Sequence, residues 1–265
     1  MSKSLPLIIG AFDGLHYGHQ KLFNTVNGKF NVLLIANSPK KVNKSLFLIS
    51  DRQSILKQCF NEINKVYVYD LRTQSKNSNK FIQYIKNINP KCVVVGNNWR
   101  FGKNRMCTHA DLQKYFNVSV VAIDKKYSIS KVKELIANGD VDRANKLLIS
   151  KYYARGVVVH GKHLGAKLGY KTANIILDNN LILPCAGCYC SFTQINNRLL
   201  PSATFVNGNL IETHIFAFDK NIYGKTIKVY LDKYIQANTK AKDFADLQKI
   251  IKNKINKIKN SLSLK

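Results

Sequence analysis

One stretch decides the fold: Gly10-Ala11-Phe12-Asp13-Gly14-Leu15-His16-Tyr17-Gly18-His19, near the start of the chain. An apolar run precedes it at residues 5–9 and is long enough for one buried strand. Apolar residues then recur with the spacing of one helix face, at Leu22, Phe23 and Val26. The stretch therefore lies where a strand ends and a helix begins, which is where open α/β sheets bind their ligands.

The residue types in this stretch suit a phosphate group. A helix start presents free backbone N–H groups and a partial positive charge. Gly10, Gly14 and Gly18 allow tight turns and a close approach of the backbone to a ligand. His16 and His19 can donate hydrogen bonds to phosphate oxygens as charge builds in a transition state. The alternative is a glycine turn with two surface histidines.

Strand-like and helical segments alternate over the first half of the chain. The expected strands are residues 5–9, 32–36, 65–69, 92–95 and 118–123. A capping box at Ser50–Gln53 marks the start of one of the helices between them. This alternation predicts an α/β domain with a doubly wound parallel sheet.

Two helices close this half and set its limit. Gly139 is typical of a helix C-terminus, and Asp140 can cap the helix that follows. A domain boundary is then expected near Ser150, which gives a first domain of residues 1–150 and a second of residues 151–265.

The second domain has a different pattern. Short β-type runs are separated by Gly and Asn turns, which predicts a small antiparallel barrel. The runs are residues 156–160, 172–177, 188–195, 199–205, 212–218 and 226–231. Residues 243–262 form an amphipathic pattern, and we expect this terminal helix to pack on the barrel.

Composition limits the class of protein. The 265 residues carry a formal net charge of +27, and 45% of them are hydrophobic, which is enough for a core. Basic residues are spread along the chain, which favours a solvated basic background over nucleic-acid binding. A nucleic-acid-binding protein built on a nucleotide-binding scaffold stays open as the alternative.

Cysteines and hydropathy bear on the compartment. The pattern Cys185-x-x-Cys188-x-Cys190 lacks the second ligand pair of a structural zinc site, so cysteines in a strand and turn are the favoured interpretation. The sequence shows neither a signal peptide nor an apolar segment of about 20 residues. We therefore expect a cytoplasmic protein without a membrane partner.

Residues 10–20 resemble the nucleotide-binding signature of nucleotidylyltransferases. In the longer form Gly-x-Phe-Asp-Gly-x-His-x-Gly-His-Gln they are similar to the bacterial riboflavin kinase/FAD synthetase family. The resemblance implies that residues 1–150 transfer AMP from ATP to FMN, which gives FAD and pyrophosphate. It assigns His16 and His19 to the transferring phosphate, and it implies ATP contacts at Gly10, Phe12, Asp13 and Gly18.

Residues 96–102 resemble the family segment Gly-x-Asp/Asn-Phe-x-Phe-Gly. The resemblance implies that Asn98 binds a phosphate-bound Mg²⁺ or a nucleotide hydroxyl, and that Phe101 contacts the flavin ring. Aromatic side chains supply area and stacking for such a contact. The alternative is a strand-end turn with core aromatics.

Residues 128–133 stand where the family has Ile-Ser-Ser-Thr-x-Ile-Arg, which implies that Ser130, Lys131 and Lys133 bind ATP phosphates. The match departs at Lys133, since lysine is not equivalent to the arginine fork, and at Ile129, where a hydroxyl is lost. A plain N-cap role for Ser130 is the alternative. The family's Pro-His-Pro is also replaced, by Ser-Pro-Lys at residues 38–40. A chain with only the kinase half active is therefore a second possibility.

Residues 156–161 and 164–175 resemble the riboflavin kinase signature, Gly-x-Val-x-x-Gly followed by Leu-Gly-Phe-Pro-Thr-Ala-Asn. Gly161 and Gly165 would let backbone amides approach ATP phosphates. Thr172 and Asn174 point to one side of a strand and offer the oxygen ligands that Mg²⁺ prefers. Lys171 stands where the family has proline.

Residues 211–215 resemble the family's Leu-Glu-Val-His segment, which implies that Glu212 is the base for the ribityl hydroxyl of riboflavin. The alternative is a surface carboxylate on a strand. Together the segments of the second half imply a riboflavin kinase over residues 151–265, which makes FMN and ADP from riboflavin and ATP. The implied ligands of the whole chain are ATP, riboflavin, FMN and Mg²⁺.

Overall fold

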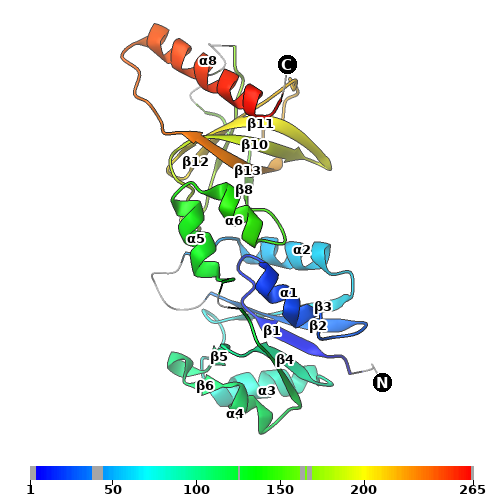
Figure 1. Cartoon of the computed structure of the whole chain (residues 1–265). Coiled ribbons are helices and arrows are strands. Elements are labelled where there is room, and N and C mark those ends of the chain that lie inside the picture. Colours follow the sequence, from blue (N-terminus) through cyan, green and yellow to red (C-terminus); the bar gives the residue numbers. More distant parts are fainter. Residues whose placement is uncertain (1–3, 38–43, 125, 162–164, 166–168, 264–265) are drawn as a thin grey trace. The chain divides into compact units, whose positions relative to one another are not determined.

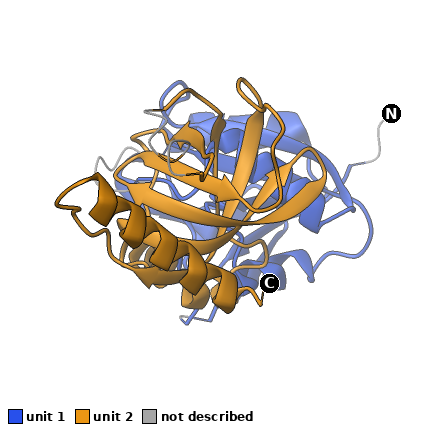
Figure 2. Cartoon of the chain, turned by 90° about the horizontal axis from the view of Figure 1, so that it is seen from above, with its two compact units in different colours: residues 1–129 blue, residues 130–265 orange. Residues whose placement is uncertain are grey.

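The computed structural model describes residues 4–37, 44–124, 126–161, 165 and 169–263. The chain divides into two compact units, residues 1–129 and 130–265, which Figure 2 colours separately. Each unit contains its own main sheet, and each is described by itself.

Five parallel strands form the main sheet of the first unit, in the order β3-β2-β1-β4-β7. They are β1 (Leu7–Gly10), β2 (Phe30–Ala36), β3 (Ile63–Asp70), β4 (Val93–Gly96) and β7 (Val118–Val121). Two helices lie on either face in Figure 1: α1 (Tyr17–Phe23) and α2 (Ile49–Cys59) on one, α3 (Ser78–Ile88) and α4 (His109–Gln113) on the other. The prediction of a doubly wound parallel sheet is confirmed.

The centre of this sheet explains its apolar strands. Leu7, Ile8 and Ile9 of β1 are at most 1% exposed, because helices cover both faces of the sheet. The strand order reverses between β1 and β4, which pair in parallel with Leu7 opposite Val93. Such a reversal opens a crevice at the carboxyl ends of the strands. The segments that follow β1 and β4 therefore start side by side.

The start of α2 differs from the prediction. The helix begins at Ile49 with Leu48 as its N-cap residue, and the cap makes no side-chain hydrogen bond. The predicted capping box at Ser50 is therefore wrong. Tertiary contacts fix this helix start instead, since the buried side chain of Arg52 donates from Nε to the carbonyl of Phe47 at 3.0 Å.

The second unit is a six-stranded antiparallel sheet in the order β8-β13-β10-β11-β12-β9. Its strands are β8 (Tyr153–Val157), β9 (Ala173–Ile176), β10 (Gly187–Ile195), β11 (Arg198–Asn207), β12 (Leu210–Ile215) and β13 (Thr226–Gln236). Val159 N donates to Asn174 O at 2.8 Å, in a bridge that joins the two edges of the sheet. The sheet is thus a nearly closed barrel, as predicted.

Two helices precede the barrel, α5 (Ile129–Ala137) and α6 (Val141–Leu147). As predicted, Gly139 follows the first helix with φ +84°, and the Asp140 side chain caps the second. The side chain of Asn145 accepts from Tyr152 N at 2.8 Å and donates to Leu231 O at 2.9 Å. These bonds attach α6 to the barrel strands. The boundary between the compact units accordingly precedes the one expected near Ser150.

The barrel interior contains a ladder of hydroxyl groups that the sequence pattern did not predict. Its five members are each 0% exposed and lie on three neighbouring strands: Ser191, Thr193, Ser202, Thr204 and Thr213. Thr204 Oγ1 donates to Thr213 Oγ1 at 2.9 Å, and Thr193 Oγ1 donates to Ser202 Oγ at 2.9 Å. Ser191 Oγ is 2.7 Å from Thr204 Oγ1 and 2.8 Å from Ser202 Oγ, which joins the two halves of the ladder. Buried polar groups are tolerated in a protein core when they are hydrogen-bonded, as these hydroxyl groups are.

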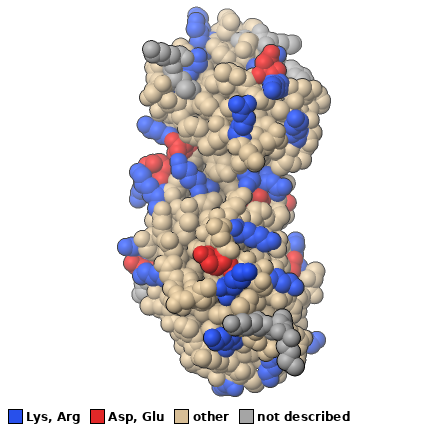
Figure 3. Space-filling model, turned by 90° about the vertical axis from the view of Figure 1, so that its right-hand side faces the viewer, with Lys and Arg blue, Asp and Glu red and all other residues tan. Residues whose placement is uncertain are grey.

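The terminal helix α8 (Phe244–Ser261) packs on the barrel as predicted, with Ile255 and Ile258 buried. Cys188 and Cys190 lie in β10 within the same apolar cluster, and all six cysteines are free thiols. Among the described residues, none of the helices combines the length and hydropathy needed to cross a bilayer. On the face in Figure 3, basic side chains lie singly or in small groups with acidic ones among them.

Candidate functional site

The first candidate site lies at the carboxyl ends of β1 and β4. Gly10 ends β1, and a Cβ atom there would lie 2.5 Å from the Phe12 ring. Phe12 itself has φ +44° and is 2% exposed. Only glycine at position 10 lets the chain turn back over this ring, and the turn leads the backbone to His16.

His16 and His19 are brought together at the start of α1. His16 is the N-cap residue, and its backbone N–H donates to His19 Nδ1 at 3.4 Å. The two imidazole rings stack with centroids 3.7 Å apart and planes 13° from parallel. Because Nδ1 of His19 accepts, its Nε2 carries the proton in the neutral ring and is a donor.

Burial controls the charge of both histidines. Desolvation lowers the pKa of His16 from 6.5 to about 4, against a smaller opposite effect of a backbone hydrogen bond. Desolvation also lowers the pKa of His19 well below its usual value, and the neighbouring His16 lowers it further. Within the described residues His16 Nδ1 is buried without a hydrogen-bond partner. Both rings are therefore neutral near pH 7, and a nearby anion would favour their protonation.

Gly18 lies between His16 and Tyr127. A Cβ atom at position 18 would be 2.8 Å from Tyr127 Cβ and 3.0 Å from His16 Nδ1. The Tyr127 ring is parallel to that of His16 to within 13°, at a centroid distance of 6.4 Å. Gly18 is thus required by the packing of His16 and Tyr127 around it. Tyr127 is a neighbour of the histidines that sequence reasoning missed.

The Asp13 carboxylate is engaged by the protein itself. Asp13 Oδ1 accepts from Leu46 N at 2.9 Å and from Phe47 N at 3.2 Å. It also pairs with Arg52 at 3.1 Å, where both side chains are at most 10% exposed. Burial lowers the pKa of Arg52, and the charge of Asp13 opposes that effect.

Arg52 is a second residue that sequence reasoning missed. Besides Asp13 it binds the carbonyl oxygens of Ala11 and Phe47, at 3.3 and 3.0 Å. Nη2 of Arg52, the nitrogen that pairs with Asp13, also donates to Ser45 Oγ at 2.7 Å. Arg52 therefore fastens the motif to the segment before α2, and no local pattern marks such a partner.

The segment after β4 places Asn98 and Phe101 in different environments. Asn98 is exposed, and a Cβ atom at Gly96 would be 3.3 Å from its Oδ1. Phe101 is 7% exposed and packs on Phe81, with ring centroids 5.2 Å apart. Trp99 is half-buried and stacks on Phe101 at 5.1 Å. Trp99 thus covers the ring of Phe101, the residue predicted to contact the flavin. Of the two aromatic residues, Trp99 is the more accessible.

Ser130, Lys131 and Lys133 lie in the first turns of α5. Ser130 is the second residue of that helix, so the alternative that it forms the N-cap is wrong. Lys131 Nζ pairs with Glu134 at 3.2 Å in an exposed contact. All three belong to the second compact unit, residues 130–265.

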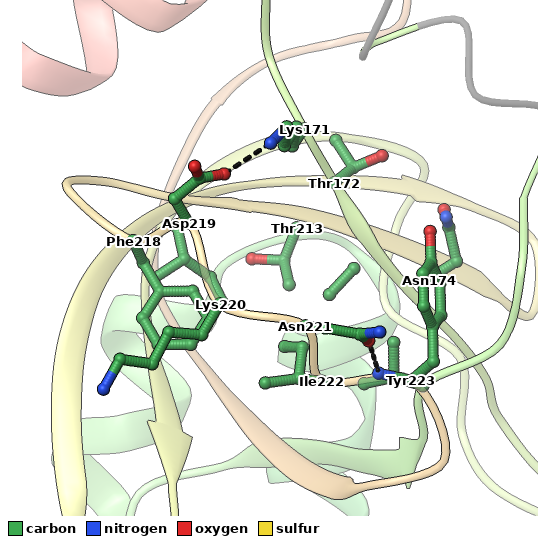
Figure 4. Close-up of a pocket in the computed structure, with 13 residues that line it drawn as sticks. Lys171, Thr172, Asn174, Thr213, Phe218, Asp219, Lys220, Asn221, Ile222 and Tyr223 are labelled. Atoms are coloured by element: carbon green, nitrogen blue, oxygen red, sulfur yellow. Dashed lines mark hydrogen bonds and ion pairs between the residues drawn. The ribbon is translucent and has the colours of Figure 1, made fainter.

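The second candidate site is a pocket of about 350 Å³ beside the barrel (Figure 4). Thr172 and Asn174 line it at the start of β9, and Thr213 and Ile215 line it from β12. Residues 218–223, between β12 and β13, form its other side. The structure thus brings the two predicted magnesium ligands into one pocket.

Asn174 has an acceptor available for a cation. The residue is 4% exposed, and within the described part of the chain its Oδ1 is buried without a hydrogen-bond partner. A Cβ atom at Gly161 would be 2.4 Å from Asn174 Nδ2, so only glycine fits against this amide. A buried amide oxygen beside the Thr172 hydroxyl is a donor set that fits Mg²⁺.

Glu212 is half-buried in β12, directly opposite Asn174 in the register of β12 and β9. Directly opposed residues of antiparallel strands point to the same face, with Cβ atoms about 5 Å apart. Thr213, the next residue, points to the other face, and it is Thr213 that lines the pocket of Figure 4. Glu212 therefore stands beside Asn174, although it is not one of the residues that line the pocket.

His214 holds the start of β9. Its Nδ1 is 2.8 Å from Lys171 O, and its ring meets that of Tyr170 edge-on at 5.4 Å. Burial lowers the pKa of His214, and the hydrogen bond to the Lys171 backbone opposes part of this effect. Gly165 bonds through its carbonyl to Tyr170 N at 2.8 Å, and a Cβ atom there would be 2.6 Å from Tyr170 O. Residues 162–164 and 166–168 of the predicted glycine-rich turn lie outside the described residues, as do residues 38–43.

Two family profiles match the chain, one for each half. The FAD synthetase profile matches residues 2–137, and the riboflavin kinase profile matches residues 148–262. A bifunctional riboflavin kinase/FMN adenylyltransferase of Mycoplasma pneumoniae is 32% identical, over 92% of this chain and 93% of its own. The enzyme of the same description from Bacillus subtilis is 29% identical, over 91% of this chain and 87% of its own.

Two other similarities have different descriptions. The trifunctional protein RibF/MnmA of Mycoplasmoides gallisepticum is 34% identical over 96% of this chain, which spans 39% of the length of that relative. A crystal structure described as a macrolide-efflux protein from Streptococcus pneumoniae covers 98% of this chain and 95% of its own, with a TM-score of 0.84 and 28% identity. The match of both profiles, together with relatives that align over most of their own length, shows that the chain belongs to the bifunctional riboflavin kinase/FMN adenylyltransferase family.

Proposed function

We propose that residues 151–265 phosphorylate riboflavin with Glu212 as the base. The observation that supports this most is the cross-strand pairing of Glu212 with Asn174, whose buried Oδ1 has no partner among the described residues. A carboxylate placed beside a magnesium ligand is suited to accept a proton from a hydroxyl that attacks the bound nucleotide.

In this reaction Glu212 accepts the proton of the terminal ribityl hydroxyl of riboflavin as its oxygen attacks the γ-phosphorus of ATP. The bond between the γ-phosphorus and the bridging oxygen breaks, and ADP leaves. Thr172 and Asn174 would hold Mg²⁺, which when bound supplies neutralisation of the phosphate charge. Gly161 and Gly165 would let backbone amides approach the phosphates.

We propose that residues 1–150 carry FMN adenylyltransferase activity. An FMN phosphate oxygen attacks the α-phosphorus of ATP, and pyrophosphate leaves. His16 and His19 donate hydrogen bonds to the transferring phosphate, and the increasing negative charge favours their protonation. Gly10 and Gly18 supply close backbone approach, and the buried Phe12 and Asp13 contribute through their backbone.

Five further residues predicted from the sequence complete this proposal. Asn98 is exposed at the end of β4 and offers an oxygen to a phosphate-bound Mg²⁺. Phe101, with Trp99 over it, forms the flavin-facing aromatic surface. Ser130, Lys131 and Lys133 contact the ATP phosphates from α5. The end of the FAD synthetase profile at residue 137, beyond Lys133, supports their assignment to this reaction.

Product analysis tests both activities with purified protein, ATP and Mg²⁺. Riboflavin is supplied in one tube and FMN in another, and we expect FAD in both. FMN alone from the first tube, with no product from the second, would leave only the kinase, as the departures at Ile129 and Lys133 allow. No flavin product from folded protein would contradict both proposals.

We also propose a cytoplasmic location, which the six free thiols suit and which cell fractionation would check.

A further inference from the structure

The mouth of the second pocket carries an ion pair that the kinase proposal does not use. Lys171 Nζ pairs with Asp219 Oδ1, and both residues line the pocket (Figure 4). Lys171 immediately precedes Thr172 at the start of β9, whereas Asp219 lies in the segment between β12 and β13. The pair therefore joins two sides of the pocket beside a predicted magnesium ligand.

Both partners are accessible. The Lys171 side chain is 72% exposed and that of Asp219 is 80% exposed. An ion pair between exposed side chains contributes little stability, because water screens it and two flexible chains must be held. The ammonium of Lys171 can therefore leave Asp219 at small cost when a stronger anion arrives.

The backbone of Lys171 is held more firmly than its side chain. Its carbonyl oxygen is 2.8 Å from His214 Nδ1, and the adjacent Tyr170 ring packs edge-on against that imidazole. The ammonium thus moves on a four-carbon stem whose base is fixed next to Thr172. Within that reach lies the place where Thr172 and Asn174 would hold the nucleotide.

We propose that Lys171 is an additional phosphate-binding residue of the kinase pocket, held by Asp219 until nucleotide enters and then transferred to an ATP phosphate. A phosphate chain carries several negative charges, so it competes effectively with one exposed carboxylate for the ammonium. Asp219 then acts as an internal competitor of the nucleotide. This inference rests on the proposed placement of ATP at Thr172 and Asn174.

Lys171 replaces the proline of the family signature, so this contact would be particular to chains with a basic residue at this position. Lys220 lines the same pocket one residue after Asp219 and adds a second positive charge at its mouth. The excess of positive charge at the mouth favours an anionic nucleotide over neutral riboflavin as the ligand of this side. The effect of Lys171 is therefore expected on ATP and not on riboflavin.

The test compares Lys171→Met, Asp219→Asn and the double variant in the full chain. Methionine keeps the length of the stem and removes the charge. We expect Lys171→Met to raise both the KM for ATP in riboflavin phosphorylation and the Kd for ATP with Mg²⁺ at the kinase site, taken from a two-site fit of equilibrium dialysis, about fivefold, the upper range for one exposed charge contact. Asp219→Asn should lower both about twofold, since a weak competitor is removed. In the Lys171→Met background, Asp219→Asn should change neither.

Lys151→Met is the matched control. Lys151 is an exposed partner of Asp232 at 3.1 Å and is not one of the pocket-lining residues. Its variant should keep the wild-type KM for ATP, and all variants should keep the wild-type Tm within a few degrees. Added salt should raise the KM for ATP more in the wild type than in Lys171→Met.

Three results would overturn the inference. The KM and Kd for ATP could be unchanged in Lys171→Met, or the KM for riboflavin could rise equally, or Asp219→Asn could raise the KM for ATP as Lys171→Met does. The last result would mean that the ion pair of Lys171 and Asp219 maintains the shape of the pocket and does not compete with the nucleotide. Failure of the kinase proposal is separate, because it would appear as a wild-type protein that forms no FMN.

Discussion

The imidazole rings of His16 and His19 stack 3.7 Å apart at the start of α1, and both are neutral because they are buried. Near pH 7, a neutral pair this close takes up a proton when an anion compensates its charge. The arrangement therefore couples histidine protonation to the arrival of phosphate, which has consequences for stability as well as for catalysis.

The first prediction is the pH dependence of stability. The pKa of His16 is about 4 in the folded chain and 6.5 when unfolded, so the unfolded state binds more protons between these values. Stability from this group is complete above pH 6.5 and is lost as pH falls towards 4, by up to about 3 kcal/mol. The free energy of unfolding from urea titrations should fall less between pH 7 and 5 in His16→Gln than in the wild type. Equal slopes for the two proteins would contradict a depressed His16 pKa.

The second prediction concerns the buried pair of Arg52 and Asp13. Removing one partner leaves a buried charge without compensation, which costs about 3 kcal/mol or more. We expect Arg52→Met to lower the Tm clearly and to reduce FAD formation from FMN, because the residue also holds the carbonyl of Ala11. Arg72→Met removes an exposed arginine paired with Asp70 at 3.2 Å and is the control, with a Tm near that of the wild type. An Arg52→Met protein as stable as this control would show that the pair is dispensable.

The third prediction separates the two reactions. Glu212→Gln keeps the shape of the side chain and removes the base, so riboflavin phosphorylation should fall about 10²- to 10⁴-fold. FAD formation from supplied FMN should stay at the wild-type rate, because Glu212 lies in β12 of the barrel and in none of the segments assigned to that reaction. Both rates are measured by chromatography of the flavin products. Loss of FAD formation from FMN in a folded variant would show that the reactions are not independent.

The fourth prediction tests the contact between Gly161 and Asn174. A methyl group at position 161 would enter the space of the Asn174 amide, 2.4 Å from Nδ2. Gly161→Ala should therefore displace the proposed magnesium ligand and raise the Mg²⁺ concentration needed for half-maximal kinase activity. Gly208→Ala is the comparison: a Cβ atom there meets nothing within 4 Å, so its φ of +61° adds backbone strain without a steric clash. An unchanged Mg²⁺ requirement in Gly161→Ala would argue against Asn174 as the ligand.

Both folds could be predicted because their signals are local. The alternation of apolar runs and helical faces predicted the parallel sheet. The spacing of Thr172 and Asn174 predicted that they share one side of a strand, and in the structure both line one pocket. The partnership of Asp13 with Arg52 could not be predicted, because it joins segments that only the tertiary structure brings together. Capping at Ser50 failed for the same reason, since the contacts of Arg52 determine where α2 begins.

The hydroxyl ladder reversed a usual expectation, and it carries the last prediction. Serine and threonine are usually exposed, yet Ser191 and Thr204 are 0% exposed and hydrogen-bonded to each other at 2.7 Å. Thr204→Val keeps the shape but deprives Ser191 and Thr213 of a partner, which should cost about 1–3 kcal/mol of unfolding free energy. Thr226→Val, at an exposed position of β13, is the matched control and should change stability by less than about 0.5 kcal/mol. Equal unfolding free energies for the two variants would mean that the ladder adds no stability over an apolar interior, and that its hydroxyls are tolerated without being required.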